Sequence, residues 1–152
     1  MIQFTLNLLE DMDTPVIEIP EMKNATALVD SGARIPVWHG REEDLLAFGA
    51  EIKQKDIHVK GLCGGDNKGN LYKLTNFQLG KLLFVELDIA VLPDMTASYN
   101  MILSSSMFRH TIYEIDDINH RFNVSVEEND YVRRLIAYYD EKQGRLYVHY
   151  NE

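Results

Sequence analysis

Short apolar segments, each bounded by turn residues, run along almost the whole chain. They are rich in Val, Ile, Leu, Tyr and Phe, a composition that favours β-strands over helices. Strands are predicted at Ile2–Leu8, Pro15–Ile19, Ala25–Val29, Ile35–Trp38, Ile57–Leu62, Leu71–Leu74, Leu82–Val91, Met101–Leu103, Thr111–Ile115, Phe122–Val126, Val132–Tyr139 and Arg145–Tyr150. The pattern therefore predicts an all-β fold.

Three segments depart from this pattern. Arg41–Phe48 is predicted to be a helix, because Leu45, Leu46 and Phe48 are apolar and Gly49 follows as a stop signal. Ser104–Phe108 is long enough for one helical turn only. The glycine-rich stretch Cys63–Asn70 predicts the tip of a mobile β-hairpin spanning roughly residues 57–74.

Composition and charge narrow the function classes. The chain has 152 residues, 45% of them hydrophobic and 26% charged, which is typical of one globular domain. Its net charge is −9 and it has no basic block, so we expect no nucleic-acid partner. We expect no membrane partner either, since no apolar stretch approaches the roughly 20 residues of a membrane span.

Cysteine and histidine usage adds expectations about compartment and metals. A lone cysteine, Cys63, excludes an internal disulfide framework and fits a reducing compartment, so we expect a cytoplasmic location. The N-terminus shows no basic region followed by an apolar block, so no signal peptide is expected. None of the histidines has close ligand spacing, and we expect no metal and no cofactor.

The most informative stretch is Asp30-Ser31-Gly32-Ala33, which follows the apolar run Ala27–Val29. It predicts a strand that delivers the Asp30 carboxylate into a tight turn. Ser31 can hydrogen-bond the turn, and Gly32 allows close approach of another backbone. One such acid cannot be both general base and general acid, and the pattern occurs once. A catalytic reading therefore requires a second copy of the chain.

A second segment, Tyr99–Phe108, follows the Asp30 turn some seventy residues later. The chain thus has the Asp30 turn first, the glycine-rich hairpin next and this segment last. In this order the three features resemble the single-domain, bacterial-type retropepsin-like aspartic proteases, whose fold is an acid-protease barrel. The resemblance covers roughly residues 16–126. It implies a protease domain over residues 1–126, with residues 127–152 as a C-terminal hairpin extension of that domain or of a dimer interface.

The resemblance implies a homodimeric endopeptidase that cleaves a peptide or protein substrate. Asp30 of each subunit would share one proton and activate a water molecule, with no covalent intermediate. Ser31 and Gly32 would support the turn, and the hairpin would close over the substrate. The implied substrate-binding residues are Gly32, Ala33, Arg34, Gly61, Leu62, Cys63, Gly64, Gly65 and Ile102, with apolar pockets expected from Ile35, Leu62, Leu92 and Ile102.

The chain departs from the family pattern at two places. Ser104 stands where the second motif usually has glycine, so its side chain either crowds the back of the Asp30 turn or is tolerated because its φ is negative. Arg34 and Ser105 stand where retroviral members have an Asp–Arg pair. The alternative function is a catalytically weak or inactive protease-fold protein that binds a peptide or partner. A third is a structural β-domain, suggested by the tyrosines near the C-terminus.

Overall fold

The computed structural model describes residues 1–152 except 21, 23–24, 61–65, 93–98, 128–133 and 152. It confirms the predicted all-β class. The elements are β1 (Ile2–Asn7), β2 (Val16–Glu18), β3 (Thr26–Asp30), β4 (Val37–Trp38), α1 (Glu42–Ala47), β5 (Glu51–Lys60), β6 (Asp66–Leu79), β7 (Leu82–Val91), β8 (Met101–Ser104), η1 (Ser105–Phe108), β9 (Thr111–Asp116), β10 (Arg121–Val126), β11 (Arg134–Asp140) and β12 (Arg145–Tyr150). None of the helices in the described ranges is long and apolar enough to cross a membrane.

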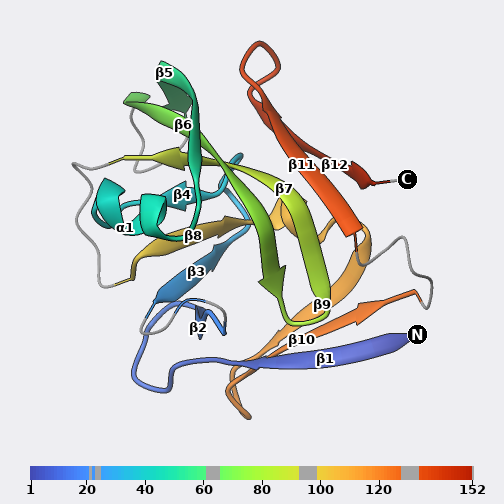
Figure 1. The fold of residues 1–152 in the computed structure, drawn as a ribbon. Coiled ribbons are helices and arrows are strands. Elements are labelled where there is room, and N and C mark those ends of the chain that lie inside the picture. Colours follow the sequence, from blue (N-terminus) through green and yellow to red (C-terminus); the bar gives the residue numbers. More distant parts are fainter. Residues whose placement is uncertain (21, 23–24, 61–65, 93–98, 128–133, 152) are drawn as a thin grey trace.

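The described strands form two sheets. An antiparallel sheet has the order β1-β10-β9 and lies at the bottom of Figure 1. The larger sheet has the order β12-β11-β7-β4-β8-β3-β2, and β6 adds to it by pairing with both β7 and β5. The short helix α1 lies to one side, and the β11–β12 hairpin rises on the other (Figure 1).

The centre of the larger sheet brings together segments that are far apart in the sequence. β3 and β4 are joined by the Asp30 turn, yet they are not neighbours, because β8 lies between them. β8 runs parallel to β3, with Asp30 opposite Ser104, and antiparallel to β4. The two segments that carried the resemblance therefore lie side by side, and η1 begins directly beside the Asp30 turn.

The central strands form the core because nearly all their side chains are apolar. Every residue of β8 is buried, and so are the last five residues of β7. A strand buried on both faces reads as a continuous apolar run, as β7 does in the sequence. Gly80 completes the tight β6–β7 turn with φ +62, and a Cβ there would lie 2.2 Å from the ring of Phe4.

The predicted hairpin is longer than the sequence indicated. Its strands are predicted at Ile57–Leu62 and Leu71–Leu74, but β5 starts six residues before the first range and ends at Lys60, and β6 starts before and ends after the second range. Residues 51–56 are all exposed, and their pairing with β6 contains register shifts. Such a segment lacks an apolar alternation, because backbone hydrogen bonds rather than side-chain burial hold it.

The C-terminal hairpin is joined to the main sheet. β11 pairs in parallel with β7, and β12 pairs with β11 across the loop 140–144, as the predicted hairpin required. The Gly144 N–H donates to the Asp140 carbonyl at 2.8 Å and closes this loop. Residues 134–151 thus extend the sheet that carries the Asp30 turn.

Candidate functional site

The Asp30 carboxylate emerges at the C-terminal end of β3, where the chain leaves the sheet. Asp30 is half-buried, and its Oδ1 accepts a hydrogen bond from the Gly32 N–H at 2.8 Å. The Ala33 N–H donates to the Asp30 carbonyl at 3.3 Å. The turn therefore fixes one carboxylate oxygen, and the other oxygen has no partner among the described residues.

Two serines of the second segment hold the back of this turn. The Ser104 hydroxyl is fully buried and donates to the Ala33 carbonyl at 2.7 Å. Its oxygen also accepts from the Ser106 N–H at 3.3 Å and so caps η1. The Ser105 hydroxyl donates to the Ser31 carbonyl at 3.3 Å. The two motif segments are therefore joined by side-chain hydrogen bonds as well as by strand pairing.

This arrangement decides between the two outcomes predicted for Ser104. Its φ is −78, a value that any residue adopts, so glycine is not required there. The side chain does not crowd the turn but satisfies one of its buried carbonyls. Of the two outcomes left open for Ser104, the structure agrees with tolerance at a negative φ, because the hydroxyl donates to the Ala33 carbonyl.

A hollow of about 340 Å³ opens beside Asp30, between β3 and β9. Asp30 is the only acid among the described residues that line it. No lysine, arginine or histidine nitrogen of the described ranges lies within 4.0 Å of the Asp30 carboxylate. An acid without a cation is free to accept a proton or a hydrogen bond from a bound molecule. The lining residues are Thr14, Pro15, Leu28, Val29, Asp30, Ser31, Tyr113 and Ile115.

The apolar pocket residues predicted from the sequence lie elsewhere. Ile35, Leu92 and Ile102 are buried in the core, with at most 3% of their surface exposed. Ile102 lies on β8 with strands on both sides, so it offers no surface to a substrate in this chain. The apolar surface beside Asp30 comes instead from Leu28, Tyr113 and Ile115. No local pattern in the sequence points to Tyr113 or Ile115, because only the packing of the two sheets brings β9 beside β3.

The remaining predicted site residues are split between two places. Ser31, Gly32 and Arg34 are exposed on the turn, and Ala33 is buried. Arg34 and Ala33 line a second hollow, of about 310 Å³, between the turn and the β11–β12 hairpin. The predicted hairpin-tip residues fall outside the described residues: Gly61, Leu62, Cys63, Gly64 and Gly65.

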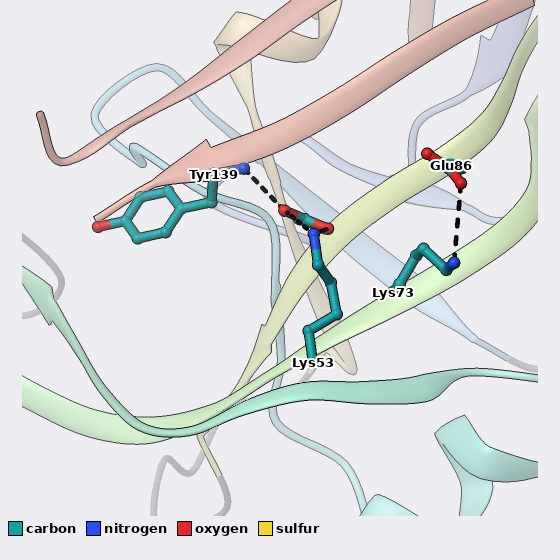
Figure 2. Close-up of polar contacts among 5 residues, drawn as sticks. Lys53, Lys73, Glu86 and Tyr139 are labelled. Carbon is teal, nitrogen blue, oxygen red and sulfur yellow. Dashed lines mark hydrogen bonds and ion pairs between the residues drawn. The ribbon is translucent and has the colours of Figure 1, made fainter. Parts of the chain in front are cut away.

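A second aspartate, which the sequence analysis did not single out, lies in a polar network away from the turn. Asp88 on β7 is 2% exposed and accepts from Lys53 Nζ at 2.8 and 3.0 Å. The Tyr139 N–H donates to the same carboxylate at 2.8 Å, and Figure 2 shows Lys53 and Tyr139 converging on it. Asp88 thus joins β5, β7 and β11. Because its carboxylate is already bonded to Lys53 and Tyr139, we assign it a structural role.

One buried histidine follows β4. His39 is buried, its ring lies edge-on to Tyr99, and its Nε2 has no hydrogen-bond partner within the described ranges. Burial lowers the pKa of His39 below its usual range, and a backbone hydrogen bond offsets this only in part. His39 therefore favours the neutral form in the folded protein.

Metal-ligand geometry and the comparisons with known proteins add no further assignment for the described residues. Among the described residues, no group of three or more His, Cys, Asp or Glu side chains could hold a metal ion. No protein-family model matches the sequence, and no curated protein matches it. The features of the described residues that bear on function are therefore the Asp30 turn and its surroundings.

Proposed function

We propose that this protein is a homodimeric aspartic endopeptidase of the retropepsin-like type, in which Asp30 of both subunits forms the catalytic pair. The observation that carries the proposal is the Asp30 carboxylate itself. It stands at the end of a central strand, is fixed by one backbone N–H and has no cation beside it among the described residues. Structural aspartates are normally paired, as Asp88 is.

The surroundings of the turn support the same proposal. Gly32 is exposed, and a Cβ at this position would meet only Asp30 Oδ1, at 3.4 Å. The chain's own packing therefore does not require glycine here, whereas close approach of a second backbone would. The hydrogen bonds from Ser104 and Ser105 make the turn rigid, as a catalytic carboxylate needs.

The chemistry needs two such turns facing each other. Two carboxylates about 3 Å apart cannot both ionise, so the pair holds one proton. The ionised Asp30 accepts a proton from a bound water, whose oxygen attacks the peptide carbonyl. The protonated Asp30 donates a hydrogen bond to the oxyanion that develops. The apolar hollow formed by Leu28, Tyr113 and Ile115 would take a substrate side chain.

Dimer formation would use strands whose outer edges carry no partner in the described part of the chain. The family resemblance implies that the C-terminal extension, residues 127–152, can contribute to such an interface. β1 and β12 are each the terminal strand of their sheet. β9 is the opposite edge of the small sheet and borders the Asp30 hollow, so an extended peptide could pair with it.

The test combines cleavage with a measurement of subunit mass. The wild-type protein should cleave members of a peptide library between roughly pH 4 and 7, and Asp30→Asn should abolish cleavage while remaining folded. Sedimentation should show a dimer in the active preparation. Cleavage that persists in Asp30→Asn, or cleavage by a strict monomer, would rule out the proposed pair.

A second candidate is a protease-fold protein that binds a peptide without cleaving it. It is favoured by one observation: Asp30 is the only acid lining its hollow, so a single chain holds half of the pair. Under this candidate, sedimentation gives a monomer, and library peptides bind to the wild type and to Asp30→Asn without being cleaved.

A further inference from the structure

The hollow on the other side of the Asp30 turn has an unusual charge for this protein. Arg34, Arg109 and Arg145 all line it, together with Ser106, and none of the described residues that line it is acidic. The chain carries 24 acidic against 15 basic residues, so a hollow lined by three arginines and by no acid of the described ranges is the opposite of its average surface. The three arginines come from three separate parts of the fold: the turn, the end of η1 and the start of β12.

No carboxylate of the described residues neutralises these arginines. None of the three has a carboxylate oxygen within 4.0 Å in the described part of the chain. Arg145 is the clearest case, because Asp140 lies directly opposite it in the β11–β12 register. Opposite charges at such positions normally pair. Here the guanidinium lies 5.0 Å from the centroid of the Tyr147 ring instead.

The two acids of the neighbouring loop are engaged elsewhere. Asp140 Oδ1 accepts from the Lys142 N–H at 3.0 Å and from the Gln143 N–H at 3.2 Å, so it shapes the loop. Glu141 Oε2 lies 3.4 Å from Gln54 Nε2 on β5. Both carboxylates therefore have hydrogen-bond partners outside the hollow, and neither lines it.

The arginines are also held in place. Gly144 adopts φ +64, and a Cβ at this position would lie 3.4 Å from Arg34 Nη1, so the loop backbone packs close to that guanidinium. The backbone of Arg109 is fixed at the end of η1, where its main-chain N–H donates to the Ser106 carbonyl at 3.3 Å. An arginine guanidinium is planar and can bind a carboxylate through two parallel hydrogen bonds.

We infer that the hollow formed by Arg34, Arg109 and Arg145 binds an acidic side chain of a peptide that lies across the Asp30 turn. Asp30 and Ser31 line one hollow, and Ala33 and Arg34 line the other. A peptide in the first hollow therefore passes the second within a few residues. As a statement about substrate preference this inference rests on the proposed function, whereas the binding itself does not require cleavage.

The test measures binding to Asp30→Asn protein, so that cleavage cannot consume the probe. The probe is an end-blocked peptide of alternating leucine and serine with a central pair of glutamates, and its counterpart carries glutamines there. We expect the glutamate peptide to bind at least about tenfold more tightly at low salt, since charge-assisted hydrogen bonds are the stronger kind. The double variant Arg109→Gln/Arg145→Gln should lose this preference.

Controls separate the hollow from general charge effects. Arg41→Gln removes an equally exposed arginine that is paired with Asp44 at 3.0 Å, and it should leave the preference unchanged. In the otherwise unaltered Asp30→Asn protein, the glutamate peptide should shift the side-chain Nε–H resonances of Arg109 and Arg145, a readout that needs no further variant. Equal binding of the two peptides, or unshifted resonances, would overturn the inference.

The outcomes also distinguish this inference from the proposed function. If the glutamate peptide is preferred but the wild type cleaves nothing, the arginine hollow is supported as a binding site and the protease proposal is ruled out. If the wild type cleaves peptides but shows no preference for glutamate, the protease proposal is supported and the binding of acidic side chains by the arginine hollow is ruled out. Binding of a phosphoserine peptide but not of the glutamate peptide overturns the assignment to carboxylates.

Discussion

Asp30 and Asp88 are two aspartates in the same large sheet with opposite surroundings. Asp88 is buried, contacts Lys53 and accepts a backbone N–H from β11. Asp30 stands at a strand end beside an open hollow, with the Gly32 N–H as its partner and no cation within the described residues. The fold compensates the charge of the Asp88 carboxylate, whereas the Asp30 carboxylate remains accessible to a proton or a bound molecule.

The difference shows how burial and partners separate structural from functional acids. A buried carboxylate must be paired, because losing water costs several kcal/mol in practice. Asp88 meets this cost and in return joins three strands (Figure 2). Asp30 has one hydrogen bond to its own turn and no ion pair among the described residues, so packing does not explain its position, and the proposed chemistry would explain it.

The largest effect is expected from Asp88→Ala. Removing this carboxylate leaves the Tyr139 N–H without its acceptor and Lys53 without its partner. Breaking a buried pair costs about 3–5 kcal/mol, and because Lys53 is 40% exposed we expect about 3 kcal/mol, measured by urea unfolding. The matched control is Glu86→Ala on the same strand, whose pair with Lys73 at 3.7 Å lies at the surface and should contribute under about 1 kcal/mol. Equal effects would show that Asp88 does not join the strands.

A smaller loss is expected from Ser104→Ala, which tests the rigidity of the Asp30 turn. The variant removes the buried hydrogen bond to the Ala33 carbonyl and the cap of η1, so we expect a loss of about 1–2 kcal/mol. Ser105→Ala removes a half-exposed bond of 3.3 Å and should cost under about 0.5 kcal/mol. Ser104→Gly, which restores the family pattern, should also destabilise; a gain in stability would contradict the role given to this hydroxyl.

A pH-dependent effect is expected at His39, whose burial is offset only in part by a backbone hydrogen bond. Its pKa is lowered by burial, so as pH falls below about 6.5 the unfolded chain takes up a proton that the folded chain does not. Stability should therefore be constant above this pH and fall as pH drops toward the lowered pKa. Urea unfolding of His39→Gln across this range should show a weaker decline than wild type.

His149→Gln is the matched control for this experiment. It removes an exposed histidine of β12 and leaves the buried site untouched. An identical decline in wild type and His39→Gln would assign the acid sensitivity to other groups. Since the proposed cleavage assay includes acidic buffers, this measurement also defines where the protein stays folded.

The smallest change in stability is expected from Asp30→Asn. The asparagine carbonyl oxygen can still accept the Gly32 N–H, and no ion pair of the described residues is lost. We expect the free energy of unfolding to change by under about 0.5 kcal/mol. A loss comparable to that of Asp88→Ala would mean that Asp30 is a structural acid, and the comparison between the two aspartates would fail.

The sequence by itself determined the all-β class and most of the elements. Apolar strands, the helix that begins after Arg41 and the strand that leads into the Asp30 turn each follow from local patterns. These features are encoded locally, because apolar alternation and turn residues act over a few positions. The extent of β5 was mispredicted, since an exposed strand held by backbone pairing leaves no such pattern.

Only the tertiary structure decided how the turn is surrounded. The insertion of β8 between β3 and β4 gave Ser104 its partner at Ala33, and sheet packing brought Tyr113 to Asp30. The same packing buried Ile102 and gathered Arg34, Arg109 and Arg145 around one hollow. These relations join residues up to about a hundred positions apart, and no local pattern encodes them. Close packing of the whole chain sets which side chains meet.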